Sequence, residues 1–199
     1  MLGRMKRGIC LLLVALMLFT SVPVVAFANS QLSEWAVEYV DRALERGLIP
    51  QHLQSQYTQP ITRAEFAALA VTLYEFWSGE IIGRIPFDDT DDINVEKAAY
   101  IGVVNGVGDH RFAPDNQLTR EQAATMLARL VDAMEEGIPD NPPTFVDNDI
   151  VSSWAMEAVG QMQATGIMTG VGGNRFAPRG DYTREQSILT ILRLYELLS

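Results

Sequence analysis

Gln59-Pro60-Ile61-Thr62-Arg63-Ala64-Glu65-Phe66 is the stretch that decides the fold, because two close copies of it follow along the chain. The copies are Gln117-Leu118-Thr119-Arg120-Glu121-Gln122 and Asp181-Tyr182-Thr183-Arg184-Glu185-Gln186. Their threonines are 57 and 64 residues apart. Repetition at such a period is typical of one supersecondary unit copied in tandem. The sequence therefore predicts three structural repeats.

Each copy carries the signal for a helix start. A Thr followed three residues later by Glu or Gln forms a capping box, in which each side chain accepts a hydrogen bond from the other residue's backbone N–H. The pairs are Thr62 with Glu65, Thr119 with Gln122, and Thr183 with Gln186. Apolar residues at helical spacing follow each pair. We therefore expect an α-helix to begin at each copy.

The arginine after each threonine is not explained by helix stability. A cation in the first turn faces the positive end of the helix dipole, which costs roughly 0.3 kcal/mol. A helix N-terminus beside a guanidinium is suited to a carboxylate or a phosphate. An ion pair with an acidic neighbour is the alternative, because the chain is rich in Asp and Glu. Both interpretations stay open for Arg63, Arg120 and Arg184.

Composition limits the class of protein. The chain has 199 residues, a hydrophobic content of 48% and a formal charge of −10. This charge argues against a nucleic-acid-binding protein and leaves no basic patch for an anionic membrane. A basic start, an apolar run over residues 9–19 and the sequence Ala26-Phe27-Ala28 predict a signal peptide over residues 1–28. We expect a secreted chain without membrane attachment after cleavage; an uncleaved membrane anchor is the alternative.

The rest of the chain divides into repeats at residues 29–79, 86–136 and 144–199, each predicted as helix, loop and helix. The fold class is therefore all-α, with the three units packed together because two amphipathic helices cannot bury both apolar faces alone. Trp35 and Trp154 lie at matching places, each 12 residues before a helix-ending glycine. The second repeat has Thr90 or Val95 there, depending on the gap. A tryptophan at a helix start is either core or an exposed surface on which a sugar can stack.

Several motifs together resemble S-layer homology (SLH) repeats. They are Trp-Ala, the Gly-Val turn, Arg-Phe-Ala-Pro, and Thr-Arg-Ala-Glu or Thr-Arg-Glu-Gln. The resemblance covers essentially all of residues 29–199 and implies a compact pseudo-threefold helical domain with grooves between repeats. It also implies non-covalent binding of secondary cell-wall polysaccharide, commonly through terminal pyruvylated N-acetylmannosamine, at the bacterial cell wall or S-layer.

The resemblance assigns roles by motif position. Arg63, Arg120 and Arg184 would pair with the pyruvate carboxylate, and Trp35 and Trp154 would pack against the sugar. The residues expected to shape the groove ends are Thr62, Glu65, Thr119, Gln122, Thr183 and Gln186. Because the second repeat lacks the tryptophan, we expect unequal grooves, with the groove built on the first helix of that repeat weak or silent.

Other classes of protein fit the sequence less well. A secreted hydrolase would need paired carboxylates, but no such pair recurs, so we expect no enzyme activity. A calcium-dependent docking module would need an EF-hand pattern, which Asp88, Asp89, Asp91 and Asp92 do not supply; we expect no metal and no cofactor. A protein–protein adaptor that binds other surface proteins through the same grooves, and binding to peptidoglycan itself, remain open alternatives.

Overall fold

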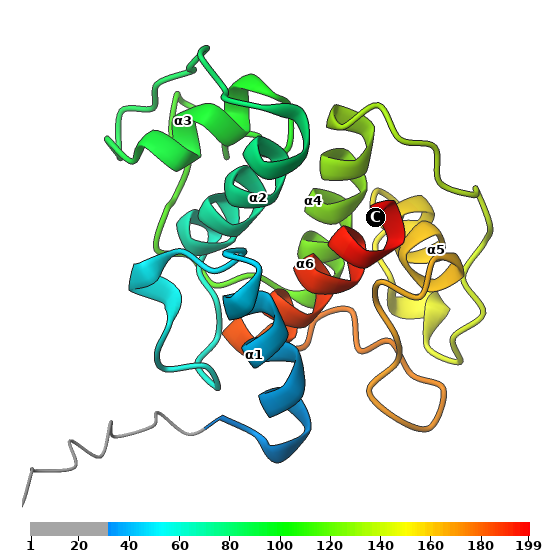
Figure 1. The fold of residues 1–199 in the computed structure, drawn as a ribbon. Coiled ribbons are helices and arrows are strands. Elements are labelled where there is room, and N and C mark those ends of the chain that lie inside the picture. The colour runs from blue at the N-terminus through cyan, green and yellow to red at the C-terminus, as the bar shows by residue number, and fades with distance from the viewer. Residues whose placement is uncertain (1–31) are drawn as a thin grey trace, which may run out of the picture.

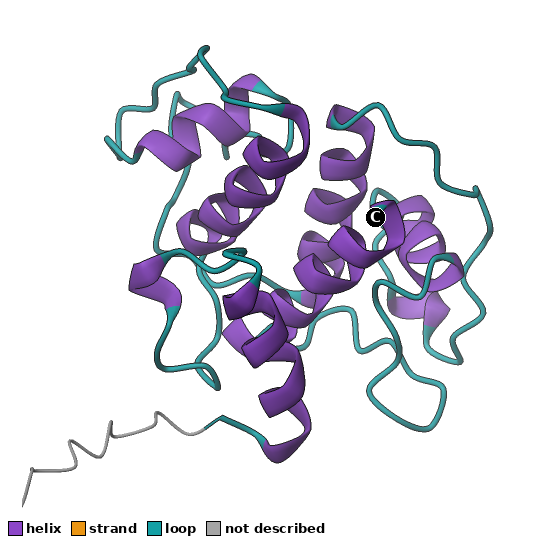
Figure 2. Ribbon diagram, viewed as in Figure 1, coloured by secondary structure: helices purple, strands orange, loops and turns teal. Residues whose placement is uncertain are grey.

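The computed structural model describes residues 32–199, so the predicted signal peptide over residues 1–28 lies outside the described residues. Within residues 32–199 the chain forms six α-helices and three short 3₁₀ helices, and Figure 2 shows no strand. The α-helices are α1 (Val37–Glu45), α2 (Arg63–Ser78), α3 (Ile93–Tyr100), α4 (Arg120–Ala133), α5 (Met156–Ala164) and α6 (Arg184–Leu198). The 3₁₀ helices cover Glu34–Ala36, Gln51–Leu53 and Asn148–Ile150. The predicted all-α class is confirmed.

The three long helices α2, α4 and α6 begin where the repeated motif predicts. All three capping boxes are formed, with Thr62, Thr119 and Thr183 as the N-cap residues. The shorter helices α1, α3 and α5 are followed by Gly47, Gly102 and Gly166, whose φ angles are 70°, 78° and 72°. Such left-handed backbone is accessible to glycine without a Cβ clash. Local sequence therefore sets both the starts of the long helices and the ends of the short ones.

The segments just before the three long helices meet in a closed ring of backbone hydrogen bonds. The N–H of Ile61 donates to the carbonyl of Tyr182 (2.8 Å), that of Leu118 to Ile61 (3.0 Å), and that of Tyr182 to Leu118 (3.2 Å). All three side chains are buried. The ring gives the fold an approximate threefold axis that relates the units α1–α2, α3–α4 and α5–α6.

Each short helix packs on the long helix of the preceding unit (Figure 1): α3 lies on α2, α5 on α4, and α1 on α6. The last contact joins the first and third units and closes the arrangement. One hydrophobic core runs through all three units, with Phe66, Phe112 and Phe176 fully buried. Every groove that lies between units is therefore built from distant parts of the chain.

Two buried glutamates link neighbouring units through hydrogen bonds. Glu185 at the start of α6 accepts hydrogen bonds from the hydroxyl (2.7 Å) and the backbone N–H (3.1 Å) of Ser33. Glu121 at the start of α4 accepts the same pair from Ser152 (3.0 and 2.8 Å). The equivalent position in α2 is Ala64, so α3 lacks this connection. Within residues 32–199, no helix combines the length and apolar character needed to cross a bilayer.

Candidate functional site

The backbone N–H groups at the starts of α2, α4 and α6 are already used within the protein. The N–H groups of Arg63 and Ala64 donate to the carbonyls of Asn116 (2.9 Å) and Pro114 (3.1 Å). The third N–H donates to the N-cap threonine. Equivalent bonds serve α4 and α6. Within residues 32–199, the first-turn N–H groups of these helices are therefore already bonded, and an anion at this place would take its hydrogen bonds from the arginine side chains.

Arg63 and Arg120 are held in the same way by backbone carbonyls of the following unit. The Nε of Arg63 donates to Phe112 O (2.9 Å) and its Nη2 to Asn105 O (2.8 Å). The Nε of Arg120 donates to Phe176 O (2.7 Å) and its Nη2 to Thr169 O (2.8 Å). Each guanidinium also lies over the ring of the same phenylalanine, with Cζ 4.4 and 4.9 Å from the centroids of Phe112 and Phe176.

These bonds orient the guanidinium but leave part of it free. A guanidinium has five N–H groups, and the carbonyls take one on Nε and one on Nη2. Within residues 32–199, Nη1 of Arg63 and of Arg120 makes no hydrogen bond. The edge formed by Nη1 and Nη2 can therefore donate two parallel hydrogen bonds to a carboxylate.

A carboxylate braces the loop that supplies each phenylalanine carbonyl. Asp147 accepts from the N–H groups of Phe176 (2.8 Å) and Ala177 (2.9 Å). Asp89 accepts from Phe112 and Ala113 (2.8 Å each). The bond from Phe112 holds the pKa of Asp89 below its ordinary value. Burial acts to raise the pKa of Asp147, but its two backbone donors outweigh burial and lower it.

Asp89 and Asp147 therefore brace the turns that supply these carbonyls. Within residues 32–199, no three His, Cys, Asp or Glu side chains are close enough to share a metal ion.

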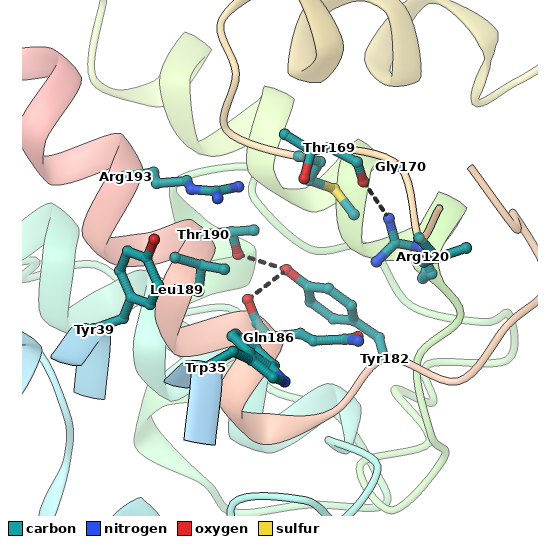
Figure 3. Close-up of a pocket in the computed structure, with 12 residues that line it drawn as sticks. Trp35, Tyr39, Arg120, Thr169, Gly170, Tyr182, Gln186, Leu189, Thr190 and Arg193 are labelled. Atoms are coloured by element: carbon teal, nitrogen blue, oxygen red, sulfur yellow. Dashed lines mark hydrogen bonds between the residues drawn. The ribbon is translucent and has the colours of Figure 1, made fainter. Parts of the chain in front are cut away.

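The Arg120 groove is a cavity of about 490 Å³ between the second, third and first units. Figure 3 shows Arg120 and Arg193 on opposite sides of this cavity, with Trp35 and Tyr39 of the first unit along its rim. Its floor includes Tyr182, whose hydroxyl bonds to Thr190 and whose pKa burial raises to about 12. The remaining lining residues include Met168, Thr169, Gly170, Val171, Gln186 and Leu189.

The Arg63 groove is a smaller cavity of about 170 Å³ that repeats this design one unit earlier. Arg63 replaces Arg120, Trp154 replaces Trp35, and Arg129 replaces Arg193. The other lining residues are Val104, Asn105, Gly106, Gln122, Thr125 and Met126. The two grooves are thus related by the approximate threefold axis, and each combines residues of all three units.

Trp35 and Trp154 are not core residues. Their exposed fractions are 46% and 55%, and each lines one of the two grooves. Val95, one of two residues proposed for the matching place in the second unit, is fully buried, as Val40 and Val159 are in α1 and α5. It is therefore a core residue and not a counterpart of the tryptophans.

Sequence reasoning missed Arg129 and Arg193. Each lies nine residues after the arginine that opens its helix, so each recurs at the same place in α4 and α6, and this recurrence was a signal in the sequence. Burial lowers the pKa of Arg63, and the positive charge of Arg129 lowers it further. An anion bound between these two guanidinium groups would relieve their repulsion.

Arg184 has different surroundings, although its local motif is the same. Its Nη2 donates to Glu65 Oε1 (2.6 Å) and its Nη1 to the carbonyl of Ser55. It lines neither the Arg63 groove nor the Arg120 groove. Among the predicted residues, the structure therefore brings Arg63 together with Gln122 and Trp154, and Arg120 together with Gln186 and Trp35. It places Arg184 and Glu65 in an ion pair.

The comparisons with known proteins identify the repeated segments. A sequence model of the family described as "S-layer homology domain" matches residues 86–124 and 146–186. An amylopullulanase of Thermoanaerobacterium thermosulfurigenes is 28% identical over 84% of this chain and 9% of its own length. An endoglucanase of Bacillus sp. (strain KSM-635) is 27% identical over 84% of this chain and 18% of its own length. The S-layer protein sap of Bacillus anthracis is 30% identical over 60% of this chain and 14% of its own length.

The chain thus spans less than a fifth of the length of these relatives. Two of the segments described above are matched by the domain model, and the matched relatives include S-layer and cell-surface proteins. These findings indicate a location at the cell wall or cell surface. The chain thus carries S-layer homology domains at residues 86–124 and 146–186 and is similar to S-layer and cell-surface proteins.

Proposed function

We propose that this chain is a non-covalent cell-wall anchoring module that binds acidic sugar termini of secondary cell-wall polysaccharide in the Arg63 and Arg120 grooves. One observation carries the proposal: an oriented guanidinium with a free edge lies beside an exposed tryptophan, in the same arrangement twice. The first unit, residues 29–79, completes the module as a further repeat, because Trp35 and Tyr39 form one wall of the Arg120 groove.

The two side chains suit the two parts of a pyruvylated N-acetylmannosamine terminus. The free guanidinium edge fits the pyruvate carboxylate, because a planar fork of donors matches two carboxylate oxygens. The indole face of Trp35 or Trp154 offers an apolar surface to the sugar ring. Arg129 and Arg193 add a second positive charge to each groove.

The net charge of −10 is consistent with such local recognition. An acidic protein repels a polyanion at long range, but this repulsion is screened beyond about 8 Å at physiological salt. Binding must then come from short, charge-assisted hydrogen bonds inside the grooves, and each of these contributes about 1.5–3 kcal/mol. We therefore expect binding to persist at moderate salt.

Co-sedimentation with purified bacterial wall sacculi tests the proposal. The protein should pellet with intact sacculi and stay in solution after acid removal of the secondary polymer. The variant with both Arg63→Ala and Arg120→Ala should stay in solution with either. Arg179→Ala is the matched control, because Arg179 is exposed and lines neither groove.

The other outcomes identify the alternatives. Pelleting that survives removal of the secondary polymer would indicate binding to peptidoglycan itself. A folded protein that does not pellet with sacculi of a host carrying the pyruvylated polymer would refute the anchoring proposal and favour an adaptor that binds other surface proteins.

A further inference from the structure

Arg184 opens the third copy of the motif, yet its guanidinium is turned to different partners. In Arg63 and Arg120, backbone carbonyls occupy Nε and Nη2, and Nη1 bonds to none of residues 32–199. In Arg184, the Ser55 carbonyl and the Glu65 carboxylate occupy Nη1 and Nη2. The buried Nε of Arg184 has no hydrogen-bond partner among the described residues. The edge that fits a carboxylate in the two grooves is therefore already filled at Arg184.

The residue that fills it occupies a position shared by all three long helices. Glu65, Gln122 and Gln186 are each the third residue of their helix, and each accepts a hydrogen bond from the N-cap backbone N–H. Gln122 lines the Arg63 groove and Gln186 lines the Arg120 groove. Gln122 and Gln186 are neutral, and within residues 32–199 Arg63 and Arg120 form no salt bridge, whereas the carboxylate of Glu65 forms one with Arg184 (2.6 Å).

We infer that Glu65 is a specificity-determining residue that occupies the anion position of Arg184 with its own carboxylate and so closes the junction between the third and first units to acidic ligands. This inference rests on the proposed function of the other two grooves. It means that the residue at the third helix position, Glu or Gln, decides whether the arginine of the preceding unit can bind an external acidic ligand.

Two further features agree with a closed junction. The position of Arg129 and Arg193 is Thr72 in α2, whose hydroxyl donates to the carbonyl of Ala68 (2.8 Å). The junction therefore has a neutral threonine where each of the two grooves has its second arginine. An intramolecular carboxylate also competes at a high effective concentration, in the millimolar range or above for tethered groups. A weakly bound external carboxylate cannot displace it.

The test is the substitution Glu65→Gln, which copies the residue found in α4 and α6 and retains an acceptor for the capping box. Arginine side-chain ¹⁵N NMR would follow the protein during titration with the methyl glycoside of pyruvylated N-acetylmannosamine. In the unaltered protein, we expect the signals of Arg63 and Arg120 to shift and that of Arg184 to stay. In Glu65→Gln, the signal of Arg184 should shift as well, and the bound equivalents should rise from two to three.

The possible outcomes separate the two proposals. If Arg63 and Arg120 respond but Arg184 responds in neither protein, or responds already in the unaltered one, the role of Glu65 is overturned and the proposed function stands. If no arginine responds in either protein, the proposed function fails and the inference fails with it.

The reciprocal substitution Gln122→Glu keeps the inference testable if Glu65→Gln does not fold. It places a carboxylate beside Arg63, so the Arg63 signal should stop responding while Arg120 still shifts, and one bound equivalent should be lost. Two equivalents bound with unchanged affinity would contradict the inference.

Discussion

Asp147 should be a large stability determinant although it touches no proposed ligand. It is buried and accepts hydrogen bonds from the N–H groups of Phe176 (2.8 Å) and Ala177 (2.9 Å). Asp147→Ala would leave both donors without an acceptor. A buried donor without a partner costs about 1–3 kcal/mol, and the N–H of Ala177 is only partly buried. We expect a loss of about 2–4 kcal/mol in the free energy of unfolding.

Urea and thermal denaturation would measure this loss. For a domain of this size, each kcal/mol shifts Tm by roughly 2–4 °C, so Tm should fall by roughly 10 °C. Asp149→Ala is the matched control, because it removes the same charge from an exposed residue two positions away. A loss below about 1 kcal/mol for Asp147→Ala, or an equal loss for both variants, would refute the bracing role.

The same substitution should act on binding and on pH dependence. Phe176 also supplies the carbonyl that holds Arg120, so the Arg120 groove should lose affinity while the Arg63 groove keeps it. The folded-state pKa of Asp147 is lowered. The ionised Asp147 therefore contributes to the free energy of unfolding above its unfolded-state pKa of about 3.9. This contribution is lost as pH falls through the lower folded-state pKa. The stability difference between Asp147→Ala and the unaltered protein should thus shrink in acid.

Three further predictions concern the grooves and the joints between units. Trp154→Ala should weaken binding in the Arg63 groove about five- to tenfold by calorimetric titration without changing Tm, whereas Trp77→Ala, outside both grooves, should leave affinity unchanged. Arg120→Lys keeps the charge but cannot bond both carbonyls and a carboxylate in one plane, so affinity in the Arg120 groove should fall at least tenfold; full retention would count against the fork geometry. Glu185→Ala should lower the free energy of unfolding by about 1–3 kcal/mol, measured by urea denaturation, because the hydroxyl and the N–H of Ser33 lose their acceptor. An unchanged urea midpoint would show that the contact between Ser33 and Glu185 does not stabilise the fold.

Local features of the fold could be predicted because their causes lie within one helical turn. A capping box involves residues three positions apart, so Thr62, Thr119 and Thr183 fix the starts of α2, α4 and α6 without help from the rest of the chain. The glycines that end the short helices act locally as well. The repeat of these signals also predicted the number of helix pairs.

The hydrogen-bond partners of each arginine could not be predicted, because they come from other units. Arg63 and Arg120 find carbonyls 49 and 56 residues away in Phe112 and Phe176, whereas Arg184 finds Glu65 at a separation of 119 residues. The three motifs are nearly identical, so only the closure of the ring shows which arginine meets a carboxylate. Similarly, the exposure of Trp35 and Trp154 depends on which long helix the short helix that follows each of them, α1 or α5, packs against.

The sequence by itself thus determined the all-α class, the helix starts and the set of arginines and tryptophans available for binding, because these depend on residues close together in the chain. Only the tertiary structure decided that, among the described residues, Arg63 and Arg120 keep a free guanidinium edge and Arg184 does not. The physical reason is that hydrogen bonding and charge neutralisation act over a few ångströms in space. The neighbours that supply them are chosen by how the three units close on one another.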